Sequence, residues 1–335
     1  MKHSNVAIFV PHNGCPHCCS FCNQVRITGK DNQPKAEDIE TAVITAKESR
    51  SYNPEKSEIA FFGGSFTAIE RSYMLMLLET AYKHVSDGSF AGIRISTRPD
   101  CIDEDVLGIL RQYGVTSIEL GAQSMCDDVL NANKRGHTAE DVVKASEMIK
   151  KFGFELGLQM MTGLYLATAE KDLYTAKRIC ELKPATVRIY PTIIMKDTLL
   201  ADYYIQGIYD TYSLEETVEL CAELLCMFEK NGIKVIRLGL HNTDDIAKGM
   251  LSGAWHPSFG ELCFSVLYRK IFESCIEKNA LPEGIYTFYV NQREISKALG
   301  QKKSNIAYFR KKGYSISIKG REDIEKYKTE FVKNP

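Results

Sequence analysis

Short apolar runs and longer segments of helical period alternate along the first half of the chain, and this alternation limits the folds it can adopt. The runs cover residues 5–10, 57–62, 92–97, 115–120, 154–160 and 186–191, and the helical segments cover residues 36–49, 70–85, 103–113, 138–152 and 168–182. Strand, helix and strand in this order are typical of parallel βα units. Strands of such sheets are buried on both faces, which explains why the runs are almost continuously apolar.

The number of βα units predicts the kind of parallel sheet. Six units fit an incomplete, TIM-like (βα)6 barrel rather than a closed barrel of eight units. A further helix is expected over residues 213–232, and the strand-like residues 233–240 are expected to extend the barrel edge. The predicted fold class is therefore α/β, with residues 1–252 forming the partial barrel.

The pattern changes beyond Gly253. Residues 260–280 favour a helix and residues 285–290 favour a strand, so we expect residues 253–335 to form a small α+β C-terminal cap domain. The tail, residues 291–335, holds twelve Lys and Arg against five Asp and Glu. Such an excess is either a solvated surface or a region that attracts an anionic partner such as RNA.

The composition excludes several classes of protein. Hydrophobic residues make up 44% and charged residues 25% of the 335 residues, which predicts a packed core. The formal net charge of −1 excludes a chain whose whole surface binds polyanions. Eleven cysteines without regular spacing argue against a secreted disulfide framework. No apolar stretch approaches the ~18 residues that span a membrane, and no signal-peptide pattern begins the chain. A cytoplasmic location is expected.

Four of the cysteines lie within the stretch GCPHCCSFCN, residues 14–23. Two zinc half-sites would need a spacer of roughly 12–20 residues between the cysteine pairs, and here there is none. Disulfides do not suit a reducing compartment. The remaining spacing is Cys15-x3-Cys19-x2-Cys22, whose thiolates suit three irons of a [4Fe–4S] cluster, with Cys18 as a bystander. The loop follows the first strand, so it is expected at the mouth of the barrel, where active sites of this architecture lie.

This cysteine spacing, with Phe21 just before the last ligand, resembles the signature of the radical S-adenosylmethionine (radical SAM) superfamily. In that superfamily the open iron binds the amino and carboxylate groups of S-adenosylmethionine. One electron then cleaves a C–S bond and yields a 5′-deoxyadenosyl radical that abstracts hydrogen from the substrate. The resemblance implies a [4Fe–4S] cluster and S-adenosylmethionine as cofactors, and an external one-electron reductant such as flavodoxin or ferredoxin.

Further motifs narrow the resemblance to one branch of the superfamily. The stretch FFGGSFTAI (61–69) ends the second run with two glycines, whose missing Cβ atoms let a ligand approach the backbone. ISTRPDCID, IELGAQSM and NKRGHT resemble segments of the branch that contains the catalytic subunit of Elongator, although QMMTGLYLAT (159–168) departs from it. No acetyltransferase domain and no second cysteine cluster are expected.

The resemblance implies a set of cofactor-binding residues. Arg135 is expected to meet the cofactor's carboxylate, since a guanidinium pairs bidentately with a carboxylate, and Gln123 and Gln159 are expected to meet its ribose. The full predicted set is Phe21, Gly63, Gly64, Ser65, Ser96, Gln123, Arg135 and Gln159.

Polar and aromatic residues at the predicted strand ends are candidates for contacts to the substrate. Tyr190 and Trp255 offer stacking surfaces, and Asp100 or Asn13 offers a hydrogen-bonding edge for a heterocycle. The substrate candidates are Asn13, Arg98, Asp100, Tyr190, Arg237 and His241, with His12 beside them, and the candidate catalytic residues are Tyr190 and His256. Each of these side chains could instead form hydrogen bonds with backbone groups of the loops.

Three functions are consistent with these features. Over its whole length the chain resembles queuine lyases, which implies a C–N bond cleavage that releases 7-aminomethyl-7-deazaguanine from the free base queuine. The first alternative is a radical SAM enzyme that modifies tRNA, with the basic tail on the phosphates. The second is a non-catalytic iron–sulfur protein, which would have no need of Gln123 and Arg135 around an open iron. A small-molecule substrate and no membrane partner are expected.

Overall fold

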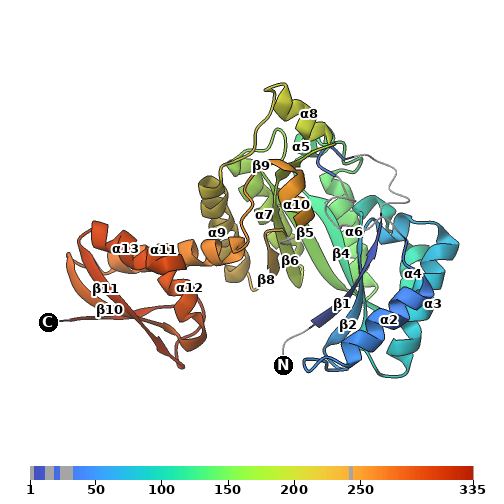
Figure 1. The fold of residues 1–335 in the computed structure, drawn as a ribbon, viewed down its shortest axis with the longest axis horizontal. Helices are drawn as coiled ribbons and strands as arrows, with labels where there is room; N and C mark the ends of the chain where they lie inside the picture. The colour runs from blue at the N-terminus through green and yellow to red at the C-terminus, as the bar shows by residue number, and fades with distance from the viewer. Residues whose placement is uncertain (1–3, 12–18, 23–32, 241–243, 335) are drawn as a thin grey trace.

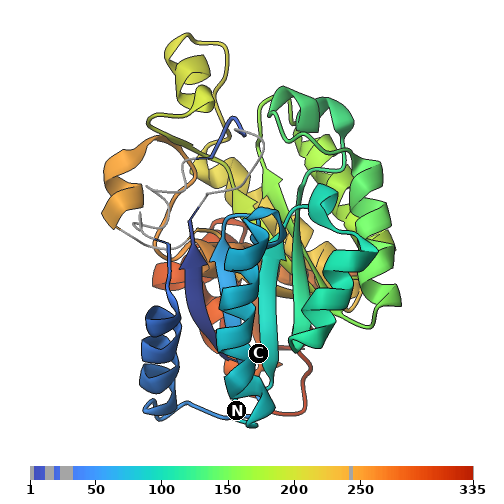
Figure 2. The same ribbon diagram turned by 90° about the vertical axis from the view of Figure 1, so that its right-hand side faces the viewer.

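The computed structural model describes residues 4–11, 19–22, 33–240 and 244–334. Its centre is a curled half-barrel of seven parallel strands in the order β1-β2-β3-β4-β5-β6-β8 (Figures 1 and 2). The strands are β1 (Ser4–Val10), β2 (Ser57–Gly63), β3 (Gly92–Thr97), β4 (Val115–Gln123), β5 (Glu155–Thr162), β6 (Thr186–Pro191) and β8 (Lys234–Leu238). The six predicted strands are confirmed, and β8 extends the sheet beyond β6 as expected.

Helices cover the convex face of the sheet. They are α2 (Ala36–Lys47), α3 (Arg71–Ser86), α4 (Glu104–Gln112), α6 (Ala139–Lys151), α7 (Ala169–Leu182) and α9 (Leu214–Lys230). Side chains from Thr138, Thr168 and Ser213 accept hydrogen bonds from first-turn backbone N–H groups, which fixes where α6, α7 and α9 begin. The apolar faces of these helices and of the strands form one large buried cluster.

The two faces of the sheet differ in chemistry. Ile59 pairs with Val6 on one side and with Ile93 on the other, and these side chains belong to the cluster beneath the helices. Because side chains alternate along a strand, the intervening residues point to the concave face. That face carries charged and polar groups, Glu58, Arg94, Ser96, Ser117, Glu119, Glu155, Gln159 and Arg188.

Short elements surround the mouth of the half-barrel, at the upper end of the sheet in Figure 1. They are η1 (Phe66–Ala68), η2 (Pro99–Cys101), α5 (Asp127–Ala132), α8 (Leu199–Ile205), α10 (Asp244–Gly249), and the antiparallel pair of β7 (Ile193–Met195) and β9 (Met250–Gly253). The sequence did not predict these elements, because runs of three to seven residues are too short to show a period.

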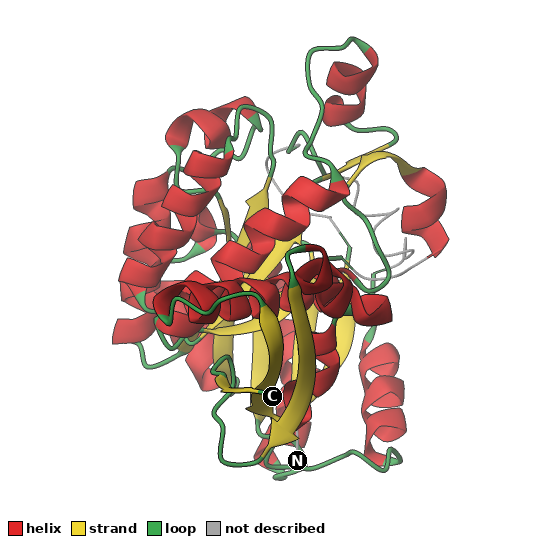
Figure 3. Cartoon of the chain, turned by 90° about the vertical axis from the view of Figure 1, so that its left-hand side faces the viewer, coloured by secondary structure: helices red, strands yellow, loops and turns green. Residues whose placement is uncertain are grey.

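The C-terminal cap has its own apolar core. Figure 3 views the molecule from the left-hand side of Figure 1, where the cap lies. It contains β10 (Gly284–Asn291), η3 (Gln292–Glu294), α12 (Ile295–Leu299), η4 (Gln301–Lys303), α13 (Ser304–Lys311), β11 (Tyr314–Arg321) and β12 (Glu330–Lys333), with the strand order β11-β10-β12. The long helix α11 (Phe259–Lys278) joins the two cores, since Leu267 packs in the barrel and Phe272 packs in the cap. An α+β cap is confirmed, whereas its boundary at residue 253 stays a prediction.

Among the described residues, none of the helices combines the length and the apolar character that crossing a membrane requires.

Candidate active site

The last part of the cysteine loop is fixed between two rim elements. The backbone N–H of Ser20 donates to the carbonyl of Asn133 at the end of α5 (3.1 Å), and its Oγ donates to Asn133 Oδ1 (2.7 Å). The carbonyl of Ser20 accepts from the N–H of Leu200 in α8 (2.9 Å). A turn from Cys22 N–H to the carbonyl of Cys19 (3.1 Å) holds these two cysteines together. Cys19 is buried and Cys22 is half-buried.

Several predicted residues lie outside the described part of the chain. They are the cluster ligand Cys15, the bystander Cys18, and the substrate candidates His12, Asn13 and His241.

Arg135 connects the cysteine loop to the end of β4. Its Nη1 donates to the Sγ of Cys19 (3.2 Å), and its Nη2 donates to the carbonyl of Gly121 (2.7 Å). The guanidinium carbon lies 5.8 Å from the centre of the Phe21 ring, a cation–π arrangement. Its Nε is buried without a hydrogen-bond partner in the described structure. The guanidinium would therefore complement a thiolate ligand at this position, and its Nε donor stays unused among the described residues.

A second arginine holds the backbone of Arg135. Arg98 pairs bidentately with Asp100 through Nε and Nη2, both at 2.9 Å, and its Nη2 also donates to the carbonyl of Arg135. Burial, and then the cation of Arg135, lowers the pKa of His137 to about 4, so the imidazole is neutral near pH 7. Its Nε2 donates to the carbonyl of Ala122 (3.2 Å). These contacts position Arg135, and a substrate role for Arg98 and Asp100 stays a prediction.

Gly63 lies where the ends of β1 and β2 approach each other. Its φ of +109° is unfavourable for other residues, and an added Cβ would lie 2.6 Å from the carbonyl oxygen of Val10. The same carbonyl accepts from the N–H of Gly64 (2.8 Å). The backbone alone thus requires glycine at position 63, and the cofactor contacts predicted for Gly63, Gly64 and Ser65 stay predictions.

Gln123 ends β4 in a strained conformation. Its φ is +64°, which is uncommon for a residue other than glycine. Its Oε1 is buried and has no hydrogen-bond partner among the described residues. A buried amide oxygen without a partner is costly unless a ligand supplies a donor. This oxygen suits a hydroxyl donor, such as those of the ribose expected from the sequence.

A charged network crosses the concave face below the mouth. Glu119 accepts from Nε (2.6 Å) and Nη2 (2.9 Å) of Arg188, and from Nε2 of Gln159 (2.9 Å). Gln159 also donates to Ser96 Oγ (3.3 Å), so the structure brings these two predicted cofactor-binding residues together. Arg94 lies deeper, with Glu58 at 2.7 Å.

The remaining substrate candidates are distributed around the mouth. Burial raises the pKa of the Tyr190 phenol, and the neighbouring cation of Arg188 opposes that shift. Arg237 lies near both, donates from Nε to the carbonyl of Gly239 (3.0 Å), and has a pKa lowered by burial. The Nδ1 of His256 accepts from the N–H of Ser258 (3.0 Å).

Trp255 is half-buried, and its use as a stacking surface stays a prediction. It packs beside Ile193, Met195 and Ile246 in a small cluster at the rim.

Sequence reasoning missed the ion pair of Glu119 and Arg188. Both side chains are almost fully buried, at 1% and 12% exposure. The signal was present in the sequence, because each charged residue interrupts an apolar strand run. A buried charge needs a partner, so two such interruptions in different strands indicate a pair.

The family of the chain follows from comparison with known proteins. Residues 9–177 match the radical SAM superfamily, and residues 184–269 match the radical SAM C-terminal domain. The chain belongs to the radical SAM superfamily.

Its relatives place it near Elongator proteins within the superfamily. It is 27% identical over 248 residues to the tRNA uridine(34) acetyltransferase of Methanocaldococcus jannaschii, covering 68% of this chain and 45% of that protein. It is 30% identical over 196 residues to human Elongator complex protein 3, covering 52% of this chain and 36% of that protein. The chain thus spans less than half of the length of these relatives.

The fold is also similar to a solved structure of this group. The Elp3 of Methanocaldococcus infernus, with residues 1–46 deleted, superimposes with a TM-score of 0.64 at 21% identity, covering 84% of this chain and 65% of that one. At this identity the likeness shows the fold alone.

The described residues fit the cofactors of the superfamily, a [4Fe–4S] cluster and S-adenosylmethionine. Cys19 and Cys22 would supply soft sulfur donors beside the cation of Arg135. Arg135 and Gln123 each hold a buried polar atom without a partner in the described structure. A nucleoside derivative that carries a carboxylate and ribose hydroxyl groups would satisfy both atoms.

Proposed function

We propose that this radical SAM enzyme acts on a nucleoside within tRNA. The observation that carries the proposal is the likeness to the tRNA uridine(34) acetyltransferase of Methanocaldococcus jannaschii, which covers 68% of this chain. The catalytic residues themselves are predictions from the sequence and the site geometry.

The side chains of this protein would bind and orient the cofactors. Cys15, Cys19 and Cys22 would hold the [4Fe–4S] cluster, and Arg135 would bind the carboxylate of S-adenosylmethionine. Together these cofactors supply a hydrogen-abstracting 5′-deoxyadenosyl radical when an external reductant delivers one electron. Arg98 and His137 would keep Arg135 in place through the backbone.

The concave face would bind the adenosine part. Gln123 offers a buried oxygen acceptor, and the Glu119 carboxylate fixes Gln159 beside Ser96. Arg237 and Tyr190 lie nearer to the mouth and would contact the nucleoside. Arg237 has no carboxylate within 4.0 Å among the described residues, so its guanidinium suits a phosphate or a carbonyl of the substrate.

The likeness to queuine lyases supports a second candidate, cleavage of the C–N bond of free queuine to release 7-aminomethyl-7-deazaguanine. Both candidates use the same cofactors and the same mouth. They differ in whether the substrate arrives as a polymer or as a free base.

One experiment separates the two candidates. The protein is purified without oxygen, its cluster is reconstituted, and it is reduced with flavodoxin in the presence of S-adenosylmethionine. Bulk tRNA from a strain that lacks the gene, or free queuine, is then added, and 5′-deoxyadenosine is measured. The tRNA is digested to nucleosides and analysed by mass spectrometry.

The proposal predicts more 5′-deoxyadenosine and an altered nucleoside in the tRNA sample, both absent with Cys19→Ala. Loss of queuine with release of 7-aminomethyl-7-deazaguanine, and no change in tRNA, would instead establish the lyase. If neither substrate changes and no 5′-deoxyadenosine forms, the chain is a non-catalytic iron–sulfur protein.

A further inference from the structure

The C-terminal cap contains a long stretch without acidic residues. Residues 295–321 hold eight Lys and Arg and no Asp or Glu. The stretch runs through α12, η4, α13 and β11, so the structure decides whether acidic groups from elsewhere neutralise it.

Ion pairs neutralise only part of this charge. Lys297 pairs with Glu294 (3.0 Å), Lys312 pairs with Glu273 (2.8 Å), and Arg321 pairs with Glu330 (2.7 Å). Five exposed cations of this stretch have no carboxylate within 4.0 Å in the described part of the chain, and one of them, Lys319, lies apart from the others on β11. The other four flank or end α13. They are Lys302, Lys303, Arg310 and Lys311.

These four cations lie at the two ends of α13. Lys302 and Lys303 precede the first turn, and Arg310 and Lys311 form the last turn. Positions 307 and 310 are three residues apart in the helix, so they share one face, and Lys303 is the residue directly before its first turn. The small, exposed Ala307 lies between the two cationic ends of the helix. The eight-residue helix separates the two cationic ends by about 12 Å.

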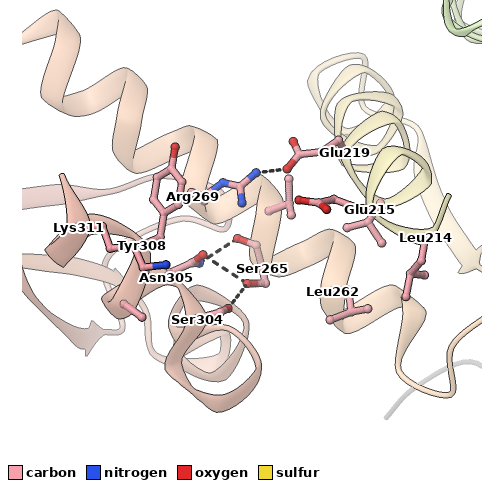
Figure 4. A pocket seen from close by; sticks show the side chains of 13 residues that line it. Leu214, Glu215, Glu219, Leu262, Ser265, Arg269, Ser304, Asn305, Tyr308 and Lys311 are labelled. Atoms are coloured by element: carbon pink, nitrogen blue, oxygen red, sulfur yellow. Dashed lines mark hydrogen bonds and ion pairs between the residues drawn. The ribbon is translucent and has the colours of Figure 1, made fainter.

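The groove next to α13 includes only one of these cations, Lys311. It has a volume of about 550 Å³ and lies between α9, α11 and α13 (Figure 4). Arg269 on its wall pairs with Glu219 and stacks on Tyr308 at 4.8 Å. Lys311 stands at its edge, as Figure 4 shows. The charge of Arg269 is thus already paired, whereas the cations of α13 face solvent.

We propose that Lys302, Lys303, Arg310 and Lys311, named here the α13 cationic face, bind the phosphate backbone of the RNA substrate. This inference rests on the proposed function and names a docking surface for it. Evenly spaced phosphates suit separated cations with a small residue between them, because the small residue lets the backbone approach closely. The surface carries no selection for sequence, since phosphate contacts position a nucleic acid without reading its bases.

The position of the cap favours a polymer over a free base. The cap stands beside the β8 edge of the sheet, opposite β1 and α2 (Figure 1). Helix α11 has 20 residues and is about 30 Å long. It begins shortly after β9, which lies at the mouth, and ends in the cap. A folded tRNA can contact both places at once, and a free base cannot.

The test is binding of tRNA to the reconstituted enzyme at several salt concentrations, measured by fluorescence anisotropy. The variant replaces all four cations by Gln (Lys302→Gln, Lys303→Gln, Arg310→Gln, Lys311→Gln). The control removes the same charge at four exposed cations in other parts of the chain. These cations, which also have no ion pair in the described structure, are replaced by Gln: Arg50, Lys56, Lys83 and Lys177. Unchanged thermal unfolding of both variants establishes that they are folded.

The proposal expects the variant to bind tRNA at least tenfold more weakly, and the control to bind like the wild type. The slope of log Kd against log salt should fall by about 3 in the variant, because each lost phosphate contact retains its counterions. Equal affinity and slope in both variants would overturn the proposal. The proposal would also be overturned if the four substitutions weakened binding to phosphatidylserine vesicles or to polyglutamate but did not weaken binding to tRNA.

A separate measurement distinguishes this proposal from the proposed function. At saturating tRNA the variant should form 5′-deoxyadenosine at the wild-type rate, with only KM for tRNA raised. Weakened binding without any turnover of tRNA in the wild type would leave the docking surface supported and refute the reaction. Turnover with an unchanged KM in the variant would support the reaction and refute the surface.

Discussion

Arg135 donates a hydrogen bond from Nη1 to the Sγ of Cys19 across 3.2 Å, which joins residues 116 positions apart in the chain. The cysteine loop after β1 and the segment after α5 thus meet at one guanidinium. That guanidinium also binds the carbonyl of Gly121 at the end of β4. One side chain thus contacts three segments of the barrel mouth, beside the hydrogen bonds that Ser20 makes with Asn133 and Leu200.

Replacing Arg135 by Ala should weaken binding of S-adenosylmethionine by a few kcal/mol, since a buried charge-assisted contact is lost. The dissociation constant is measured by equilibrium dialysis with reconstituted protein. Arg111→Ala, which removes an exposed arginine stacked on Phe152, serves as the control. An unchanged affinity with Arg135→Ala would restrict Arg135 to a structural role.

Replacing the cysteines of residues 14–23 one at a time should show which of them bind the cluster and which one does not. Cys15→Ala, Cys19→Ala and Cys22→Ala should each abolish the brown absorption of the cluster and all cleavage of S-adenosylmethionine. Cys18→Ala should leave both largely intact. Iron content and visible absorption after anaerobic reconstitution check this. The ligand assignment is wrong if Cys18→Ala destroys the cluster and Cys19→Ala does not.

The sequence predicted the strands closely because each buried strand is a continuous apolar run. β3 and β6 cover the expected residues, and the other predicted strands differ from their runs by one to three residues at either end. It could not predict that Arg98 holds the carbonyl of Arg135, since that contact depends on how two loops meet. Nor could it predict the backbone reason for Gly63, because the carbonyl of Val10 approaches only in the paired sheet.

Gly63→Ala should distort the ends of β1 and β2 at the mouth, through a steric clash in addition to the unfavourable φ. The new Cβ would lie 2.6 Å from the carbonyl oxygen of Val10, so the ends of β1 and β2 must separate. Gly88→Ala is the matched control, because Gly88 also has a positive φ (+77°) but nothing lies within 4 Å of its added Cβ. We expect Gly63→Ala to lower the affinity for S-adenosylmethionine at least tenfold and Gly88→Ala to leave it unchanged. Equal affinities in the two variants would contradict a steric role for position 63.

Glu119→Gln should be strongly destabilising. The carboxylate is 1% exposed and pairs with Arg188, so its loss leaves a buried cation without a partner. Breaking such a pair costs about 3–5 kcal/mol of unfolding free energy. Glu155→Gln is the control, because Glu155 is 43% exposed and its pair with Arg94 is worth about 1 kcal/mol or less. Urea denaturation measures both, and similar losses would show that the Glu119 network tolerates an unpaired arginine.

Asp172 should make the stability of the barrel depend on pH. Burial raises its pKa to about 7 from 3.8, although hydrogen bonds from Gly163 N–H and Tyr212 oppose the shift. Between these values the folded protein keeps a proton that the unfolded chain has released. The contribution of Asp172 is therefore fully present below about pH 4 and is lost as the pH rises through about 7. The expected loss is about 1.4 kcal/mol per pH unit across this window.

Asp172→Asn should remove this slope, because the amide keeps an oxygen acceptor for Gly163 N–H and cannot ionise. The variant should match the wild type near pH 4 and exceed its unfolding free energy at pH 7, as measured by urea denaturation at each pH. Asp141→Asn is a control of opposite sign, since the N–H of Thr138 lowers the pKa of Asp141 and its contribution is lost as the pH falls. Equal slopes in the wild type and Asp172→Asn would mean that Asp172 is ionised in the folded barrel. The turn at Gly163 would then be held by a carboxylate rather than by a protonated acid.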